Sequence, residues 1–301
     1  MRTLHLLNLL WILLLGVFFP TTRASAEVHK DSLETKKSDH QQLWVDSVFH
    51  ALTFEERLGQ LFMVAAYSNK DQRHVDEISA LIQKENLGGL IFFQGGPNRQ
   101  ARLTNYYQAQ AKTPLMIAMD AEWGIGMRLD STLNFPKAMT LGAISDPNLV
   151  QEMGAEIARQ FKVLGMHVNF APVVDVNSNP ENPVIGFRAF GEDKNRVTQR
   201  AVAYMKGLQE NGVLANAKHF PGHGDTETDS HFTLPLIAHE EKRIWEVDLY
   251  PYQELFKENL MSVMVAHLNV PSLNRGSAIS TSLSMPIVTD LLQEQMKIYQ
   301  I

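Results

Sequence analysis

The stretch KHFPGHGDTETDSH, residues 218–231, contains three of the chain's eleven histidines together with several carboxylates. The apolar run before it, residues 212–217, is typical of a short buried strand, and Pro221, Gly222 and Gly224 then stop regular structure. The polar side chains are therefore expected on a loop at the C-terminal end of a strand. In a barrel of alternating strands and helices, active sites are built at that end.

Two kinds of chemistry fit these side chains. Asp229 and His231 are two residues apart, so an extended or looped backbone places both on one side. A carboxylate that accepts from one imidazole nitrogen fixes the tautomer and leaves the other nitrogen to exchange a proton with a substrate. A metal site would use His219, His223 and His231, but the chain has no His-Glu-x-x-His or paired-cysteine spacing, and Pro221 prevents a helix from aligning the ligands. We therefore predict acid–base chemistry and no metal.

The rest of the chain alternates between short apolar runs and amphipathic segments, which predicts parallel βαβ units. The expected strands cover residues 61–66, 88–93, 114–120, 166–176, 212–217 and 262–267. The expected helices cover residues 43–50, 53–58, 75–85, 98–111, 147–165, 194–210, 239–259 and 286–296. A doubly wound open sheet could also hold six strands, but no Gly-x-Gly-x-x-Gly turn follows any of them.

Residues 218–231 resemble the signature K-H-F-P-G-H-G-D-T-x-x-D-S-H of the β-N-acetylhexosaminidases in glycoside hydrolase family 3, and match every fixed position. The resemblance extends from about residue 53 to the last residue. It implies an α/β fold of the (β/α)8 TIM-barrel type, here truncated after about six strands. It also implies a retaining enzyme that removes terminal non-reducing β-N-acetylglucosamine and needs no cofactor.

The resemblance also implies roles for individual residues. Asp229 and His231 would form the catalytic proton donor, with Glu227 as a rival donor because most glycosidases use carboxylic acids. Five residues would bind the sugar: Asp120, Arg128, Arg188, Lys218 and His219.

Their local motifs depart from the family pattern in places. Residues 120–124 read DAEWG where the family usually has D-Q-E-G-G, and Ala189 replaces a serine after Arg188. Simpler interpretations stay open: Asp120 could cap a turn, Arg188 could form a surface ion pair, and His219 could be a core histidine. We expect Asp175 to hold a strand-end loop rather than to act in catalysis.

The family's nucleophile is an aspartate on a seventh strand, which follows a helix similar to residues 287–296. The chain ends at Ile301, so the expected nucleophile lies beyond it. Asp290 is expected to be a charge near a helix N-terminus rather than a substitute nucleophile. Two alternatives to the enzyme remain: a non-catalytic protein that binds amino sugars or muropeptides, and a β-glucosidase of the same family.

Composition and the N-terminal sequence limit the class of protein, its partners and its cellular compartment. The 301 residues are 45% hydrophobic and 20% charged with a net charge of −6, which is typical of a globular protein and argues against a nucleic-acid partner. The chain has no cysteine, which excludes disulfides and a thiolate nucleophile. Arg2, an apolar run over residues 6–19 and the A-S-A site at 24–26 predict a signal peptide over residues 1–26.

The predicted organisation follows from that signal. Residues 27–42 are expected to be a flexible lead-in, and residues 43–301 an incomplete barrel domain. We expect a periplasmic or secreted protein without a membrane span after cleavage. Its expected partner is a carbohydrate containing N-acetylglucosamine, such as a peptidoglycan fragment.

Overall fold

The computed structural model describes residues 40–298, and the chain divides into two compact units, residues 1–54 and 55–301. In the first unit, residues 40–51 are helical, so the predicted helix over 43–50 is confirmed. Residues 40–42, predicted as part of a flexible lead-in, belong to this helix. The predicted signal peptide over residues 1–26 and the rest of the lead-in lie outside the described residues.

The second unit is built on a six-stranded parallel sheet that curls into half of a barrel. The strands are β1 (Met63–Ala66), β2 (Gly89–Phe92), β3 (Met116–Met119), β4 (Val168–Asn169), β5 (Leu214–Phe220) and β6 (Ser262–Val265). Each strand pairs in parallel with its neighbour in the sequence, in the order β1-β2-β3-β4-β5-β6. A doubly wound sheet reverses its strand order at one point, so this order excludes that alternative and confirms the barrel-type fold.

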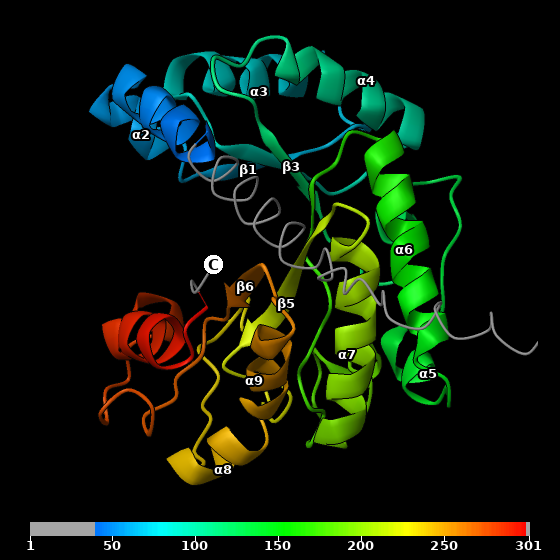
Figure 1. The fold of residues 1–301 in the computed structure, drawn as a ribbon, viewed down its shortest axis with the longest axis vertical. Coiled ribbons are helices and arrows are strands. Elements are labelled where there is room, and N and C mark those ends of the chain that lie inside the picture. Colours follow the sequence, from blue (N-terminus) through cyan, green and yellow to red (C-terminus); the bar gives the residue numbers. More distant parts are fainter. Residues whose placement is uncertain (1–39, 299–301) are drawn as a thin grey trace, which may run out of the picture. The chain divides into compact units, whose positions relative to one another are not determined.

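Helices follow the strands and cover the outside of the curved sheet (Figure 1). They are α2 (Phe54–Gly59), α3 (Gln72–Glu85), α4 (Pro97–Gln108), α5 (Ala138–Gly142), α6 (Asn148–Val163), α7 (Lys194–Gln209), α8 (Glu241–Glu246) and α9 (Tyr250–Lys257). Three short 3-10 segments occur in the connections: η1 (Ile125–Met127), η2 (Gly186–Arg188) and η3 (Thr281–Leu283). The last described element, η4 (Pro286–Gln295), is a π-type helix on the β6 side of the sheet.

Helical periodicity explains which side chains form the core. On α7, the apolar residues at helical spacing are all buried: Val197, Ala201, Tyr204 and Leu208. On α3, Leu81 is apolar but 38% exposed, while the polar Ser79 is buried. The buried positions on α3 recur every three or four residues from Val75 through Ile82, and Leu81 falls off that face.

The boundaries of two predicted strands and one predicted helix are wrong. The fourth strand is only two residues long rather than residues 166–176. The ladder is interrupted at Pro172, which has no N–H to donate, and beyond it the chain pairs with β5 only through an isolated bridge between Val173 and Lys218. The fifth strand runs on through Phe220 and so includes Lys218 and His219, which were expected on a loop. The helix predicted over 239–259 is two helices, α8 and α9, and Pro251 lies in the first turn of the second.

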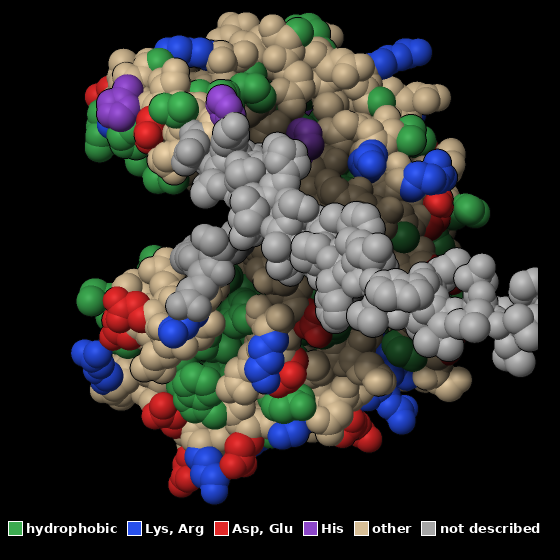
Figure 2. Space-filling model, viewed as in Figure 1, with side chains coloured by type: hydrophobic (Ala, Val, Ile, Leu, Met, Phe, Trp, Pro, Cys, Tyr) green, Lys and Arg blue, Asp and Glu red, His purple; other side chains and the backbone are tan. Residues whose placement is uncertain are grey.

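The edges of the sheet are open within residues 40–298, since β1 pairs only with β2 and β6 only with β5. None of the helices formed by these residues is long and apolar enough to cross a membrane. On the face shown in Figure 2, acidic and basic side chains are interspersed over the region of α8 and α9.

Candidate active site

Seven polar side chains meet at the C-terminal ends of β3, β4 and β5. We call them the polar cluster: Asp120, Glu122, Arg128, Asp175, Arg188, Lys218 and His219. Asp120 and Glu122 lie within three residues of the end of β3, and Lys218 and His219 are the two residues before the last residue of β5. In parallel strands these ends lie at one edge of the sheet, so residues far apart in the sequence come together.

Lys218 stands at the centre of the cluster. Its Nζ donates to Asp120 Oδ1 at 2.9 Å and lies 2.8 Å from Glu122 Oε1, and its side chain is only 2% exposed. Arg188 donates to both oxygens of Glu122, from Nη2 at 2.7 Å and from Nε at 3.0 Å. Glu122 therefore holds two cations at once in a buried position.

Arg128 completes the other side of Asp120. Its Nη2 donates to Asp120 Oδ2 at 2.9 Å and its Nε to the Asp120 backbone carbonyl at 3.3 Å. The guanidinium lies over the ring of Phe93, 4.9 Å from the centroid. Asp120 thus binds Lys218 and Arg128 through separate oxygens, and the alternative in which it only caps a turn does not describe its contacts.

Charge pairing decides the protonation of the carboxyls. Burial alone would raise the pKa of Glu122, but the Lys218 ammonium and the Arg188 guanidinium outweigh it and lower this pKa to about 2. Burial likewise opposes ionisation of Asp120, and Lys218 and Arg128 again prevail, so its pKa is lowered. Both side chains are carboxylates at neutral pH.

Asp175 anchors the first part of the 218–231 stretch. It is fully buried; its Oδ2 accepts from His219 Nδ1 at 2.7 Å, and its Oδ1 accepts from the backbone N–H groups of His219 and His223 at 3.2 and 2.7 Å. Burial lowers the pKa of His219 despite Asp175, so the imidazole is neutral. With its proton on Nδ1, its Nε2 accepts from Arg188 Nη2 at 3.3 Å.

The cluster has a solvent-facing layer and a buried layer. Asp120, Arg128, Arg188 and His219 are partly exposed, whereas Glu122, Asp175 and Lys218 lie beneath them. A bound molecule would meet the first four side chains. The three buried side chains hold the partly exposed ones in position through charge-assisted hydrogen bonds.

Asp229 and His231 form the predicted pair, but on a separate, exposed loop. Asp229 Oδ1 accepts from the His231 backbone N–H at 2.8 Å and lies 2.7 Å from His231 Nδ1. The backbone N–H and then the imidazole of His231 lower the pKa of Asp229. The His231 side chain is 78% exposed, and no partner of its Nε2 occurs in the described part of the chain. That nitrogen is therefore available to exchange a proton.

The loop is tied to the polar cluster through His223. His223 Nε2 lies 2.9 Å from Ser230 Oγ, between the two members of the pair, while the His223 backbone is bonded to Asp175. Thr226 Oγ1 lies 2.7 Å from His223 Nδ1, so both ring nitrogens have partners. At its base the loop is held by contacts of Asp225 with His239 and Arg243.

The structure thus brings together all five predicted sugar-binding residues and, separately, the predicted proton-donor pair. Their roles stay predictions, including donation from His219, whose two nitrogens are engaged by Asp175 and Arg188. Sequence reasoning missed Glu122, the carboxylate that holds Arg188 and Lys218. Its signal was its position two residues after Asp120 in the DAEWG motif.

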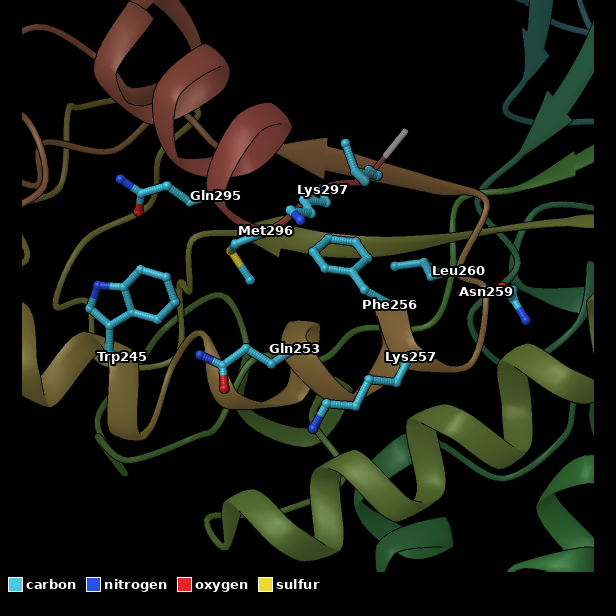
Figure 3. Close-up of a pocket in the computed structure, with 10 residues that line it drawn as sticks. Trp245, Gln253, Phe256, Lys257, Asn259, Leu260, Gln295, Met296 and Lys297 are labelled. Carbon is cyan, nitrogen blue, oxygen red and sulfur yellow. The ribbon is translucent and has the colours of Figure 1, made fainter. Parts of the chain in front are cut away.

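A pocket of about 480 Å³ lies apart from these residues (Figure 3). It is lined by residues of α8, α9 and the η4 end of the chain, among them Trp245, Phe256 and Met296. Its volume would suit a small ligand, but its lining has no carboxylate or imidazole for acid–base chemistry. Within residues 40–298, no group of three or more histidine or acidic side chains is placed to hold a metal ion.

The lowered pKa of Glu122 predicts a pH dependence of stability. Because the folded-state pKa of about 2 lies below the ordinary 4.5, the stabilisation is complete above about pH 4.5 and is lost as the pH falls toward 2. Glu122→Gln should therefore be less stable than the wild type at pH 6, and the difference in unfolding free energy should shrink by about 2 kcal/mol at pH 3. Urea unfolding of both proteins at the two pH values measures this.

The matched control is Glu258→Gln, which removes a carboxylate from an exposed pair with Lys206. Its stability difference from the wild type should be small at both pH values, because exposed pairs contribute about 1 kcal/mol or less. If the difference in unfolding free energy between the wild type and Glu122→Gln is the same at pH 6 and pH 3, Glu122 is not the ionised carboxylate that we assign.

Comparison with known proteins identifies relatives of the chain. Residues 53–299 match the family described as "Glycosyl hydrolase family 3 N terminal domain". The chain is 35% identical over 243 residues to beta-hexosaminidase A of Pseudoalteromonas piscicida, covering 73% of this chain and 41% of that protein. It is 33% identical to beta-hexosaminidase LpqI of Mycobacterium tuberculosis, covering 77% of this chain and 59% of the relative.

A solved structure agrees with these matches. The glycoside hydrolase family 3 beta-N-acetylglucosaminidase of Paenibacillus sp. str. FPU-7 superposes with a TM-score of 0.76 at 34% identity, covering 81% of this chain and 47% of that one. The chain therefore spans about half the length of the relatives that it matches.

Proposed function

The chain belongs to the family of glycosyl hydrolase family 3 N-terminal domains. We therefore propose that it supplies the sugar-binding and proton-donating parts of a β-N-acetylhexosaminidase. The substrate is a glycan with a terminal non-reducing β-N-acetylglucosamine. The observation that carries the proposal is the polar cluster: four partly exposed polar side chains held at strand ends by three buried ones.

Sugar recognition uses the solvent-facing layer of the cluster. The Asp120 carboxylate accepts from ring hydroxyls, and the guanidinium groups of Arg128 and Arg188 donate to them. Lys218 and Glu122 keep these groups in place, because each makes two ionic contacts within the cluster. Such pre-positioned charged groups bind a polar ligand without much loss of side-chain freedom.

Proton transfer uses the exposed pair. Asp229 accepts from His231 Nδ1, which leaves Nε2 to protonate the departing oxygen and later to activate water. Glu227, the alternative donor, is exposed and forms no ion pair within the described residues.

The reaction is a double displacement, and its nucleophile is an aspartate that follows residue 301. The carboxylates of the polar cluster are poor candidates for that role. All six oxygens of Asp120, Glu122 and Asp175 accept hydrogen bonds from Lys218, Arg128, Arg188 or the 219–223 segment. These donors stabilise the negative charge of the carboxylates and so make them weaker nucleophiles than a free carboxylate, while the partly exposed Asp120 keeps lone pairs that can accept from sugar hydroxyls.

The same observation favours a second candidate, a protein that binds amino sugars without cleaving them. It shares the polar cluster with the enzyme and differs in having no nucleophile. In either case, we propose that the natural ligand is a peptidoglycan fragment, which the enzyme would cleave and the binding protein would only hold. The predicted signal peptide supports a periplasmic or secreted protein that would meet such fragments.

Titration with N-acetylglucosamine tests the sugar site. Asp120→Asn should weaken binding of the monosaccharide at least tenfold, because the amide cannot accept two charge-assisted hydrogen bonds from a sugar. Isothermal titration calorimetry on the 301-residue chain measures the dissociation constant. The control Asp130→Asn makes the same change in an exposed pair with Arg99 and should bind like the wild type. Equal affinity of the wild type and Asp120→Asn would exclude the polar cluster as the sugar site.

A further inference from the structure

Two aromatic side chains flank the polar cluster in the sequence and meet in space. Trp123 follows Glu122, and Phe187 precedes Arg188. The two-pronged contact between Glu122 and Arg188 brings the rings together, with centroids 6.4 Å apart and planes at 61°. Trp123 is partly exposed and Phe187 is 52% exposed. An exposed aromatic pair therefore lies beside the ion pair of the proposed sugar site.

A lysine lies against both rings. Lys137 Nζ is 3.8 Å from the Phe187 centroid and 5.3 Å from the Trp123 centroid. The segment before Lys137 is fixed beside Trp123, since the Phe135 N–H donates to the Trp123 carbonyl at 3.0 Å. Gly124 permits this approach: its φ is +89°, and a Cβ there would lie 2.7 Å from the Phe135 ring.

The charge on Lys137 is not neutralised locally. Its side chain is exposed, and no carboxylate forms an ion pair with it among residues 40–298. Its contacts with the two rings are cation–π contacts, which leave the ammonium hydrogens free to bind an anion. The surface thus combines an apolar aromatic part with one unpaired positive charge.

We propose that Trp123, Phe187 and Lys137 form a second subsite for a sugar ring that carries a carboxylate. The apolar face of a pyranose ring packs on the aromatic side chains, and the acidic substituent pairs with the Lys137 ammonium. This rests on the proposed function: if the polar cluster holds the terminal N-acetylglucosamine, the second ring is the sugar linked to it, the leaving group of the hydrolysis. The subsite selects acidic leaving groups over neutral ones.

Calorimetry with three ligands tests the subsite on the 301-residue chain: N-acetylglucosamine, the disaccharide of two N-acetylglucosamines, and N-acetylglucosamine linked to N-acetylmuramic acid. The wild type should bind the acidic disaccharide about fivefold more tightly than the neutral one. Lys137→Met should remove this preference and leave the monosaccharide affinity unchanged. Phe187→Ala should weaken both disaccharides roughly tenfold with little effect on the monosaccharide.

Lys162→Met is the matched control. Lys162 is an exposed lysine in the last turn of α6, before the start of β4 rather than after the end of a strand, and its loss should preserve the preference. The preference of the wild type should also fall as the salt concentration rises.

The ligand set separates the two proposals. A preference that survives Lys137→Met, or disaccharides that bind no better than the monosaccharide, would overturn the subsite even if the monosaccharide binds as expected. The wild type could fail to bind the monosaccharide and still prefer the acidic disaccharide in a way that Lys137→Met removes. That result would support the subsite and contradict the assignment of the polar cluster as the site for N-acetylglucosamine. Lys137 and Phe187 are both exposed, so their replacement should not disturb the fold. Variants that unfold thermally at the same temperature as the wild type are folded.

Discussion

His231→Ala is expected to slow hydrolysis of natural disaccharides by about 10²–10⁴-fold, in a form of the protein whose barrel is complete. Without the imidazole, nothing protonates the departing sugar oxygen, which is a poor leaving group. An aryl glycoside with an acidic phenol needs little protonation, so its first step should be slowed much less. Comparison of kcat/KM for the two substrate types, in the wild type and in the variant, measures this difference.

The matched control for this prediction is His50→Ala. His50 is an exposed histidine whose Nδ1 contacts the Asp46 carbonyl, and it lies in the first unit. Its replacement should leave both rates unchanged. An equal loss on the aryl and natural substrates for His231→Ala would exclude His231 as the proton donor, and Glu227→Gln would then be expected to show the selective loss.

The sequence is most informative where a single motif carries the chemistry. Asp229 and His231 are close in the chain, so local geometry alone predicts their contact, and the structure confirms it at 2.7 Å. The alternation of apolar runs predicts all six strands of the sheet, because parallel strands buried on both faces are nearly continuous in hydrophobicity.

Features that depend on contacts between distant segments could not be predicted in this way. Glu122 is buried only because Arg188 and Lys218, 66 and 96 residues further along, surround it, and no local pattern encodes that environment. The end of β5 was placed too early because Lys218 and His219 are polar. They stay in the strand since Asp120, Glu122 and Asp175 satisfy them inside the cluster.

The break between α8 and α9 has a similar explanation. The apolar periodicity over residues 239–259 is continuous, yet the chain turns at Val247–Leu249, and a second helix begins at Tyr250 with Pro251 in its first turn. Asp248, in that turn, pairs with Arg243 and lies against Gly222 of the motif loop. The helix therefore ends where it meets the loop, which is a tertiary constraint.

A second large loss of activity is expected from the missing nucleophile. The 301-residue chain is expected to show no turnover of an aryl N-acetyl-β-glucosaminide at any pH, because loss of the covalent partner usually costs several orders of magnitude in rate. The remaining acidic candidates are occupied: Asp290 pairs with Arg275 at 2.9 Å, and Asp225 is held by His239 and Arg243. An open sheet edge at β6 would also fail to position a substrate for attack.

We propose that residues 40–298 bind and protonate the sugar while the attacking aspartate follows residue 301. A paired rate measurement tests this division of roles. The 301-residue chain is assayed beside a form extended through the remaining barrel strands, for example with the corresponding residues of the Pseudoalteromonas relative. We predict turnover in the extended form alone, and its loss when the aspartate of the added seventh strand is replaced by alanine. Clear turnover by the 301-residue chain, abolished by Asp225→Ala or Asp290→Ala, would contradict the account.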